Sequence, residues 1–252
     1  MCRHLAYLGP AVSLQSLLIE PPHGLYRQSW APRMQRYGTV NADGFGIGWF
    51  ANGDPVPARY RRGIPIWGDP SLPDLARVTR SSAVLAAVRD ATVGTALGEA
   101  AAAPFASGSW LFSHNGLLAG WPASAAGLAR VEPLLALEAM TDSAFLWALV
   151  VERLRSGTAP DIALAATIDA VEAAGGTGRF NFLLTDGRTI VATTAGDTLW
   201  YRRADDGVTV ASEPCDDEPG WTEVPDRQLL TAAPSQVTVR PLSSLNEGIG
   251  IR

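Results

Sequence analysis

Two short segments carry the residue types that an amide-cleaving enzyme needs. Removal of Met1 is expected because cysteine is a small second residue, and Cys2 would then carry both a thiol and a free α-amine. These two groups ionise at similar pH, so the amine can accept the thiol proton and leave a nucleophilic thiolate. Downstream, the Asn115 amide and the Gly116 backbone N–H can stabilise an oxyanion, each donor contributing about 3 kcal/mol.

Each of these residues also has a purely structural interpretation. An isolated cysteine is commonly a small buried apolar side chain, and Asn-Gly is a preferred pair in two-residue hairpin turns. Cys215 belongs to no matching motif, and we interpret it as incidental. The glycines of Gly46-Ile47-Gly48 superficially match a dinucleotide-binding pattern, but Asn52-Gly53-Asp54-Pro55 prevents the helix that such a site requires, so this interpretation fails.

Charged residues at the ends of predicted elements are candidates for substrate binding. Arg89 follows the apolar run 83–88, which is typical of a strand buried on both faces, and a guanidinium there could bind an anion. A surface arginine is the alternative. Asp142 lies in the first turn of a predicted helix with Thr141 as its cap, a position that the helix dipole favours without any function.

The composition excludes several function classes. The chain has 252 residues, 47% of them apolar and 18% charged, which is typical of a globular protein. A net charge of −5 argues against nucleic-acid or anionic-membrane binding, and no apolar run is long enough to span a bilayer. Two distant cysteines indicate a reducing cytoplasm rather than a disulfide framework. No Cys/His cluster, P-loop or Gly-x-Ser-x-Gly motif is present, and we expect neither a metal nor another cofactor.

The periodicity of apolar residues predicts an α+β fold in which helices pack on sheets, with no linker that would divide the chain. Segment 23–41 is predicted to be a long ordered loop. Helices are predicted at 13–18, 72–80, 141–154 and 160–174. Strands are predicted at 3–8, 45–50, 56–62, 83–88, 110–112, 179–185, 189–194, 199–203, 208–211 and 237–242.

The order of these motifs along the chain resembles that of the class II glutamine amidotransferases. The resemblance rests on Cys2, Asn41-Ala42-Asp43-Gly44, Arg89 with Ala91-Thr92, His114-Asn115-Gly116, Thr141-Asp142-Ser143 and Ser212-Glu213-Pro214. It implies an N-terminal-nucleophile hydrolase with a four-layer α/β/β/α sandwich, formed as a single domain by residues 2–252 after loss of Met1. Cys2 would be the nucleophile, and Asn115 with Gly116 would form the oxyanion hole. Arg89, assisted by Thr92, would bind the α-carboxylate of a glutamyl group, and Asp142 its α-ammonium.

A narrower resemblance points to the γ-glutamyl-hercynylcysteine sulfoxide hydrolases of bacterial ergothioneine biosynthesis, which release no ammonia. It rests on Met1-Cys2-Arg3-His4-Leu5, Pro21-Pro22-His23-Gly24-Leu25, Gln28-Ser29-Trp30-Ala31-Pro32 and Asn41-Ala42-Asp43-Gly44. The implied partner is a small γ-glutamyl substrate, whose trimethylammonium favours an aromatic face, and Trp30 is our candidate for that contact. Two alternatives stay open: the glutaminase subunit of a two-protein amidotransferase, and a catalytically silent binding module. The oligomeric state is also left open.

Overall fold

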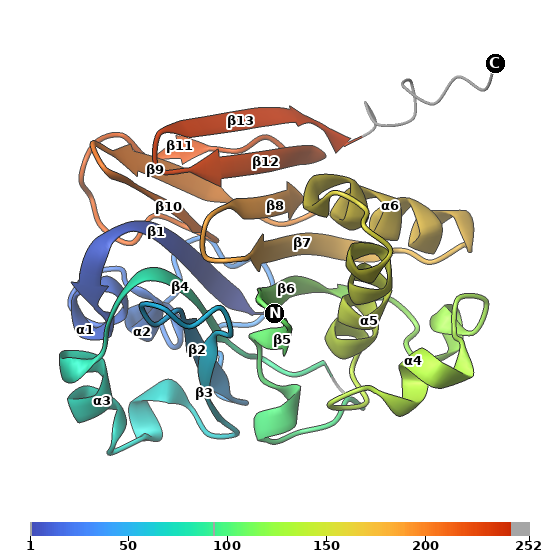
Figure 1. Cartoon of the computed structure of the whole chain (residues 1–252). Coiled ribbons are helices and arrows are strands. Elements are labelled where there is room, and N and C mark those ends of the chain that lie inside the picture. Colours follow the sequence, from blue (N-terminus) through green and yellow to red (C-terminus); the bar gives the residue numbers. More distant parts are fainter. Residues whose placement is uncertain (1, 93, 243–252) are drawn as a thin grey trace.

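Two antiparallel β-sheets form the centre of the molecule, and helices cover the outer side of each sheet (Figure 1). The computed structural model describes residues 2–92 and 94–242, so the prediction about Met1 lies outside the described residues. Within the described part, the first sheet has the strand order β11-β9-β10-β1-β4-β2-β3 and the second β13-β12-β8-β7-β6-β5. The first sheet comprises β1 (Arg3–Ser13), β2 (Phe45–Trp49), β3 (Ala58–Arg62), β4 (Arg80–Val88), β9 (Trp200–Ala204), β10 (Gly207–Ala211) and β11 (Thr222–Glu223). The second comprises β5 (Phe105–Ser107), β6 (Trp110–Leu118), β7 (Gly178–Thr185), β8 (Ile190–Thr194), β12 (Gln228–Ala233) and β13 (Gln236–Pro241).

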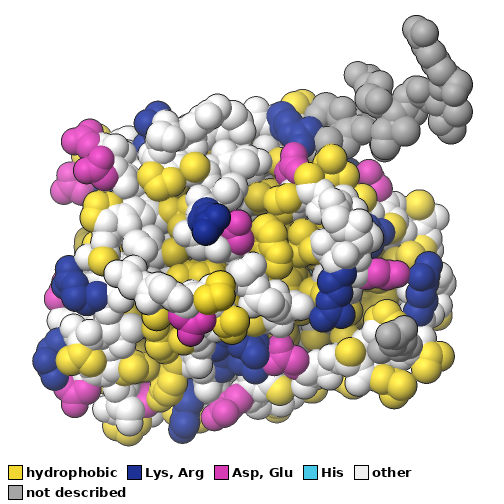
Figure 2. Space-filling model, in the orientation of Figure 1, with side chains coloured by type: hydrophobic (Ala, Val, Ile, Leu, Met, Phe, Trp, Pro, Cys, Tyr) yellow, Lys and Arg dark blue, Asp and Glu magenta, His cyan; other side chains and the backbone are white. Residues whose placement is uncertain are grey.

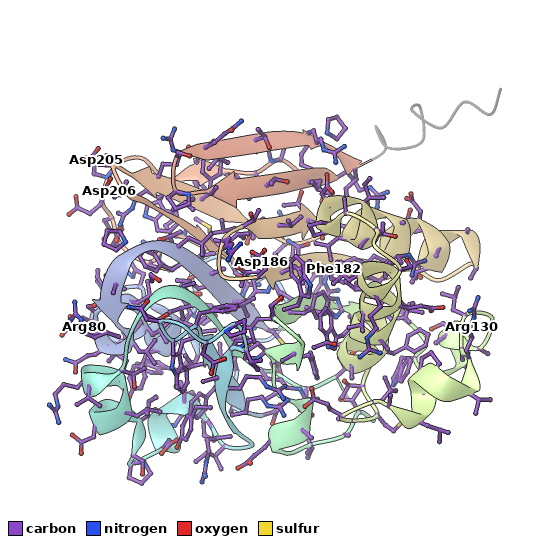
Figure 3. The ribbon with its side chains drawn as sticks, in the orientation of Figure 1. Arg80, Arg130, Phe182, Asp186, Asp205 and Asp206 are labelled. Atoms are coloured by element: carbon purple, nitrogen blue, oxygen red, sulfur yellow. The ribbon has the colours of Figure 1, made fainter. Side chains whose placement is uncertain are left out.

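Three apolar clusters separate four layers, which confirms the predicted α/β/β/α arrangement. The helices α1 (Leu14–Leu18), α2 (Leu25–Gln28) and α3 (Leu72–Val78) lie with the first sheet. The helices α4 (Val131–Leu135), α5 (Asp142–Arg155) and α6 (Pro160–Ala173) lie with the second. One cluster joins the first sheet to its helices, another joins the second sheet to α5 and α6, and a third fills the space between the sheets. Phe182, labelled in Figure 3, belongs to the cluster between the second sheet and its helices.

The predicted doubly buried strand is β4, and its alternating side chains enter different layers. Val84, Ala86 and Val88 pack toward the helices of the first sheet. Ala83 and Leu85 pack between the two sheets. Because side chains alternate between the two faces of a strand, this continuous apolar run contributes to two cores.

The two long helices agree with their predicted start and stop signals. Thr141 is the N-cap of α5, and its side-chain oxygen accepts a hydrogen bond from the Ala144 amide. Pro160 occupies the first turn of α6, and Gly175 follows the helix with a φ of +80° that other residues rarely adopt.

The structure also corrects some expectations. Strand β6 continues through Leu118, and it pairs Asn115 with Asn181 and Gly116 with Phe180. The Asn-Gly pair is therefore inside a strand, and the hairpin-turn alternative is wrong. Strand β1 extends beyond the predicted 3–8 to Ser13, with an irregular register between Leu8 and Val12. The structure adds α2, α4, β5, β11 and β12, which are too short or too weakly periodic to predict.

No helix within the described ranges is both long and apolar enough to cross a membrane. On the face shown in Figure 2, acidic and basic side chains are interspersed with apolar and neutral ones.

Candidate active site

The N-terminal end of β1 brings Cys2 beside Arg89. Strand β1 is antiparallel to β4, and its first residue, Arg3, is paired with Val88. Continuing this register by one residue places Cys2 opposite Arg89, at the same end of neighbouring strands. Residues opposite each other in an antiparallel pair lie about 5 Å apart between Cα atoms, so the thiol-bearing residue and the guanidinium-bearing residue are neighbours.

The second sheet contributes β6, which faces β1 across the space between the sheets. His4 Nδ1 lies 3.2 Å from Ser113 Oγ, and both residues are fully buried. In Figure 1, β1 and β7 run toward the same side of the view, so β6, which is antiparallel to β7, runs opposite to β1. Cys2, two residues before His4, and Asn115, two residues after Ser113, therefore lie toward the same edge of the stacked sheets. By the alternation of side chains along strands, Cys2 and Asn115 both face the space between the sheets.

The Asn115 side chain is buried without hydrogen-bond partners in the part of the chain that the structure describes. Its side chain is fully buried, yet neither Nδ2 nor Oδ1 has a partner among the described residues. Buried polar atoms are nearly always paired in folded proteins, because an unpaired one costs about 1–3 kcal/mol. Such a cost points to a ligand that completes the hydrogen bonds.

The backbone of Gly116 is directed away from β7. The N–H of its pair partner Phe180 donates to the Ala195 oxygen at 2.9 Å, and the carbonyl of Phe180 accepts from Thr193 Oγ1. Both polar groups of Phe180 thus face the β8 side, so the Gly116–Phe180 pair does not exchange backbone hydrogen bonds. The Gly116 N–H faces the other edge of β6, which β5 covers only along residues 110–112.

His114 links β6 to β7 and to the start of α5 through its two ring nitrogens. Its Nε2 lies 2.8 Å from the Arg179 carbonyl oxygen, and its Nδ1 lies 3.0 Å from Ser143 Oγ. The first contact requires a proton on Nε2, so Nδ1 accepts from the serine hydroxyl. Burial lowers the pKa of His114, while the nearby Asp142 carboxylate opposes that effect. A neutral imidazole therefore connects β6 to β7 and to the start of α5.

Arg89 is buried and only partly satisfied. Its Nη2 donates to Thr95 Oγ1 at 3.1 Å and to the Ala96 carbonyl at 2.9 Å, whereas Nη1 has no partner among the described residues. An unpaired buried guanidinium nitrogen can bind a carboxylate. The structure places Thr92 on the surface, and the hydroxyl that contacts Arg89 belongs to Thr95. The role of Thr92 therefore stays a prediction that no contact in the described part supports.

Asp142 is connected to the same region through the backbone. The Ala96 amide donates to the Met140 carbonyl at 3.3 Å, so the segment that contacts Arg89 also contacts the start of α5. Asp142 is 6% exposed, and its carboxylate accepts hydrogen bonds from the Leu118 and Ser143 amides. Both carboxylate oxygens retain lone pairs for a further donor. A cation site at Asp142 and an anion site at Arg89 are compatible with this arrangement.

The Asn41–Gly44 turn supports the strand end that carries Arg89. The Arg89 amide donates to the Gly44 carbonyl at 2.8 Å, and the Asp43 amide donates to the Arg89 carbonyl at 2.9 Å. The Asp43 carboxylate also accepts from the Ala91 amide. This motif therefore shapes the backbone around the site.

Trp30 lies in an aromatic cluster of the helical layer. Its ring contacts Tyr26 and Trp67 edge to face at centroid distances of 5.1 and 5.6 Å, and the Arg27 guanidinium lies 5.3 Å from its centroid. Among the described residues, no hydrogen bond or ring contact joins Trp30 to Cys2, Asn115 or Arg89. In the same long loop, the Tyr37 ring is 56% exposed and its centroid lies 4.5 Å from the guanidinium of Arg179 in β7. No pattern in the sequence predicted this contact between Tyr37 and Arg179.

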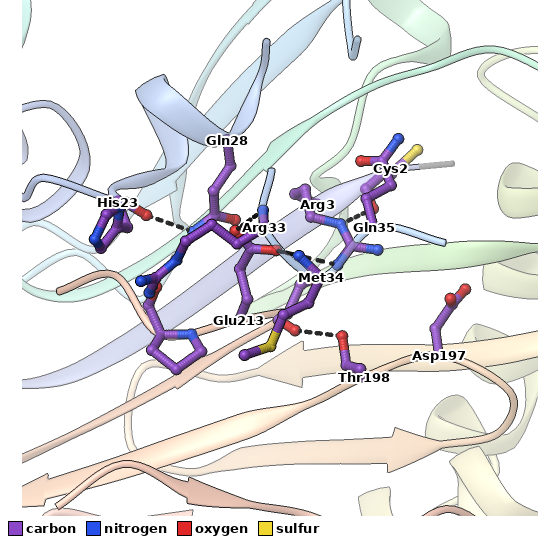
Figure 4. Close-up of polar contacts among 12 residues, drawn as sticks. Cys2, Arg3, His23, Gln28, Arg33, Met34, Gln35, Asp197, Thr198 and Glu213 are labelled. Atoms are coloured by element: carbon purple, nitrogen blue, oxygen red, sulfur yellow. Dashed lines mark hydrogen bonds and ion pairs between the residues drawn. The ribbon is translucent and has the colours of Figure 1, made fainter. Parts of the chain in front are cut away.

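A buried charged group next to the site was also missed from the sequence. Arg3 donates from Nε to the Cys2 carbonyl at 2.9 Å, and Glu213 lies 3.9 Å from Arg3 Nη1 (Figure 4). Asp197 pairs with Arg179 at 3.0 Å, and burial raises the pKa of Asp197 against the influence of that arginine. Arg3 immediately follows Cys2, which is the one sequence signal that could have indicated its role.

A separate cavity of about 370 Å³ lies between β5, α4 and α5, and Trp147, Leu137 and Phe105 are among its lining residues. None of the predicted site residues lines it. Among the described residues, no cluster of three or more His, Cys, Asp or Glu side chains is arranged to hold a metal ion.

Comparisons with known proteins show which family the chain resembles. A family model described as glutamine amidotransferases class-II matches residues 26–206. The γ-glutamyl-hercynylcysteine sulfoxide hydrolase of Mycolicibacterium smegmatis is 44% identical over 243 residues, which cover 96% of this chain and 100% of that protein. The protein of the same name from Mycobacterium tuberculosis H37Rv is 43% identical over 244 residues, covering 96% and 97% of the two chains.

Solved structures show the same fold. A glutamine aminotransferase class-II domain protein from Silicibacter pomeroyi aligns with a TM-score of 0.68 and 26% identity, over 96% of this chain and 100% of that chain. The glutamine phosphoribosylpyrophosphate amidotransferase of Bacillus subtilis also aligns with a TM-score of 0.68, at 18% identity, over 96% of this chain and 50% of that chain.

Proposed function

This chain belongs to the class II glutamine amidotransferase family, and we propose that it hydrolyses the γ-glutamyl amide of γ-glutamyl-hercynylcysteine sulfoxide. The products would be glutamate and hercynylcysteine sulfoxide, as the names of the mycobacterial relatives imply for their own reaction. We further propose that residues 2–252 act as one domain after removal of Met1, in a reducing cytoplasm, without a metal or another cofactor.

The reaction proceeds in two stages in this proposal. The α-amine of Cys2 takes the thiol proton, and the thiolate attacks the γ-carbonyl carbon of the substrate. The oxyanion receives hydrogen bonds from Asn115 Nδ2 and the Gly116 N–H. The amine then passes its proton to the leaving nitrogen, the C–N bond breaks, and a γ-glutamyl thioester remains. Water, activated by the same amine, adds to the thioester and releases glutamate and the free thiol.

The observation that carries this proposal is the fully buried and unpartnered amide of Asn115 on the inter-sheet face of β6. It lies two residues beyond the Ser113–His4 contact, on the side toward Cys2. A structural asparagine at this position would be expected to use its hydrogen-bonding capacity, as Asn181 does with Asp197 and Ala195.

The glutamyl group would be held at both ends by charged residues. Arg89 Nη1 would bind the α-carboxylate, and the Asp142 carboxylate would bind the α-ammonium, which presents the γ-carbonyl to Cys2. We retain Thr92 as part of the carboxylate site and Trp30 as the contact of the trimethylammonium, as the family resemblance suggested. Both assignments rest on the sequence alone.

A panel of γ-glutamyl amides tests the substrate assignment. Glutamate release is measured from γ-glutamyl-hercynylcysteine sulfoxide, from glutamine and from γ-glutamyl-alanine, after intact mass has established that Met1 is absent. We expect the hercynyl substrate to be cleaved with the highest kcat/KM. Release from glutamine alone would favour the alternative, a glutaminase subunit of a two-protein amidotransferase. A 28% identical relative from Saccharomyces cerevisiae is named a probable glutamine amidotransferase. No release from any of the three would refute an amidohydrolase.

The Cys2→Ala variant tests the mechanism, with Cys215→Ala as the matched control. Cys215 is buried, and we expect its variant to retain activity. We expect Cys2→Ala to retain the circular dichroism of the parent and to release no glutamate. If the Cys2→Ala variant released glutamate at the rate of the parent, the reaction could not proceed through a Cys2 thioester.

A further inference from the structure

Arg3 contacts the proposed nucleophile through its side chain. The Arg3 side chain is completely buried, and its Nε–H donates to the carbonyl of Cys2 at 2.9 Å. Strand β1 begins at Arg3, so Cys2 precedes the hydrogen-bonded ladder. The guanidinium therefore adds a side-chain restraint on the residue that directly precedes β1.

Glu213 connects Arg3 to the long loop. The Glu213 carboxylate is fully buried, and one of its oxygens lies 3.9 Å from Arg3 Nη1. Its two oxygens also accept hydrogen bonds from the backbone amides of Arg33 and Met34, at 2.9 and 2.8 Å. In Figure 4, dashed lines join the Glu213 carboxylate to the loop backbone and to Arg3, and join Arg3 to Cys2.

Burial makes this arrangement rigid. A buried carboxylate and a buried guanidinium are each costly unless paired, so each of these two side chains stabilises the other in its buried position. Desolvation lowers the pKa of Arg3, and the charge of Glu213 opposes this effect. The two side chains are thus confined to one geometry.

We propose that Arg3 is a positioning residue that orients Cys2, and that Glu213 ties this orientation to the loop at Arg33–Met34. The bond to the Cys2 carbonyl restrains rotation about the Cα–C bond of Cys2, and so sets the directions of its thiol and amine. A displacement of about 1 Å in a reacting group can lower a rate about 100-fold. The inference rests on the proposed function, because it requires Cys2 to be the nucleophile.

Arg3→Lys is the principal test. Lysine preserves the positive charge near Glu213 but has no donor at the position of Nε, so the bond to the Cys2 carbonyl is lost. We expect kcat for the γ-glutamyl substrate to fall at least tenfold while KM changes less than twofold. A folded Arg3→Lys variant with a kcat within twofold of the parent would overturn the inference.

Arg153→Lys is the matched control. Arg153 also donates to backbone carbonyls, those of Leu149 and Ala166, but it lies in the helical layer away from the site. We expect its kcat and KM to equal those of the parent. An equal fall in kcat for both lysine variants would assign the effect to general loss of stability and would overturn the positioning role.

Glu213→Gln tests the link to the loop. The glutamine NH₂ faces backbone N–H donors, so one of the two loop contacts is lost. We expect KM to rise at least fivefold together with a lower kcat, in contrast to Arg3→Lys. Parental values of both constants would overturn the link.

The double variant Arg3→Gln/Glu213→Gln removes both buried charges together, and it replaces Arg3→Lys if that variant does not fold. We expect a tenfold lower kcat here too, and a folded double variant with parental kcat would overturn the positioning role. A parent protein that cleaves no γ-glutamyl amide would instead refute the proposed function. Failure of the two proposals is therefore distinguishable.

Discussion

Acidification is expected to destabilise the folded protein through His4, which contacts Ser113 of the second sheet. His4 is completely buried, its Nδ1 faces Ser113 Oγ, and its Nε2 has no partner among the described residues. Burial, with smaller effects of Arg3 and His114, lowers the pKa of His4 from 6.5 to about 3. A protonated imidazole at this position would be a buried cation, and none of its hydrogen-bond partners among the described residues is a carboxylate.

The sign and size of the effect follow from proton linkage. Because the folded-state pKa of His4 lies below the unfolded-state value, the unfolded state binds the proton more readily. The penalty is absent above the unfolded-state pKa, grows as the pH falls below about 6.5, and is complete below about 3. The full difference corresponds to about 5 kcal/mol, and the share that is lost between pH 7 and pH 5 is about 2 kcal/mol.

Urea unfolding at pH 7 and pH 5 measures this loss in the parent and in the His4→Gln variant, which cannot titrate at this position. The pKa of His114 is lowered in the same direction, so both proteins lose its contribution and the difference isolates His4. Equal losses of unfolding free energy in the parent and in His4→Gln would refute the reasoning.

Three further outcomes are expected from the same structure. Asn115→Ala should lower kcat about 100- to 1000-fold with little change in KM, and steady-state rates within threefold of the parent would remove it from the oxyanion hole. Gly116→Ala should lower the free energy of unfolding by about 3 kcal/mol, because an added Cβ would lie 1.9 Å from the Arg179 carbonyl oxygen. The control Gly127→Ala, which meets no atom within 4 Å, should show no such loss in urea unfolding. Burial raises the pKa of Cys215 to about 12, so iodoacetamide at pH 8 should modify Cys2 and not Cys215 in the folded protein; peptide mapping that finds modified Cys215 would contradict this.

The sequence alone determined the features that repeat locally or follow one another along the chain. The run 83–88 predicted a strand buried on both faces, and β4 has that environment because its period of two distributes the side chains between two cores. The cap at Thr141 and the apolar spacing behind it predicted α5. The order of motifs from Cys2 to Glu213 indicated the family and its four layers, and the comparisons confirm both.

Only the tertiary structure decided which of these features meet. The His4–Ser113 contact joins residues 109 positions apart, and the Glu213 contacts join residues about 180 or more positions apart. Such contacts depend on how the sheets stack and on the register of β1 against β4, which no local periodicity specifies. The hydroxyl beside Arg89 came from Thr95, three residues beyond the threonine that the motif suggested, and this hydroxyl also donates to the Thr92 carbonyl. Local pattern sets which face of a strand is buried, whereas the packing of one layer on another sets which side chains lie together to form a site.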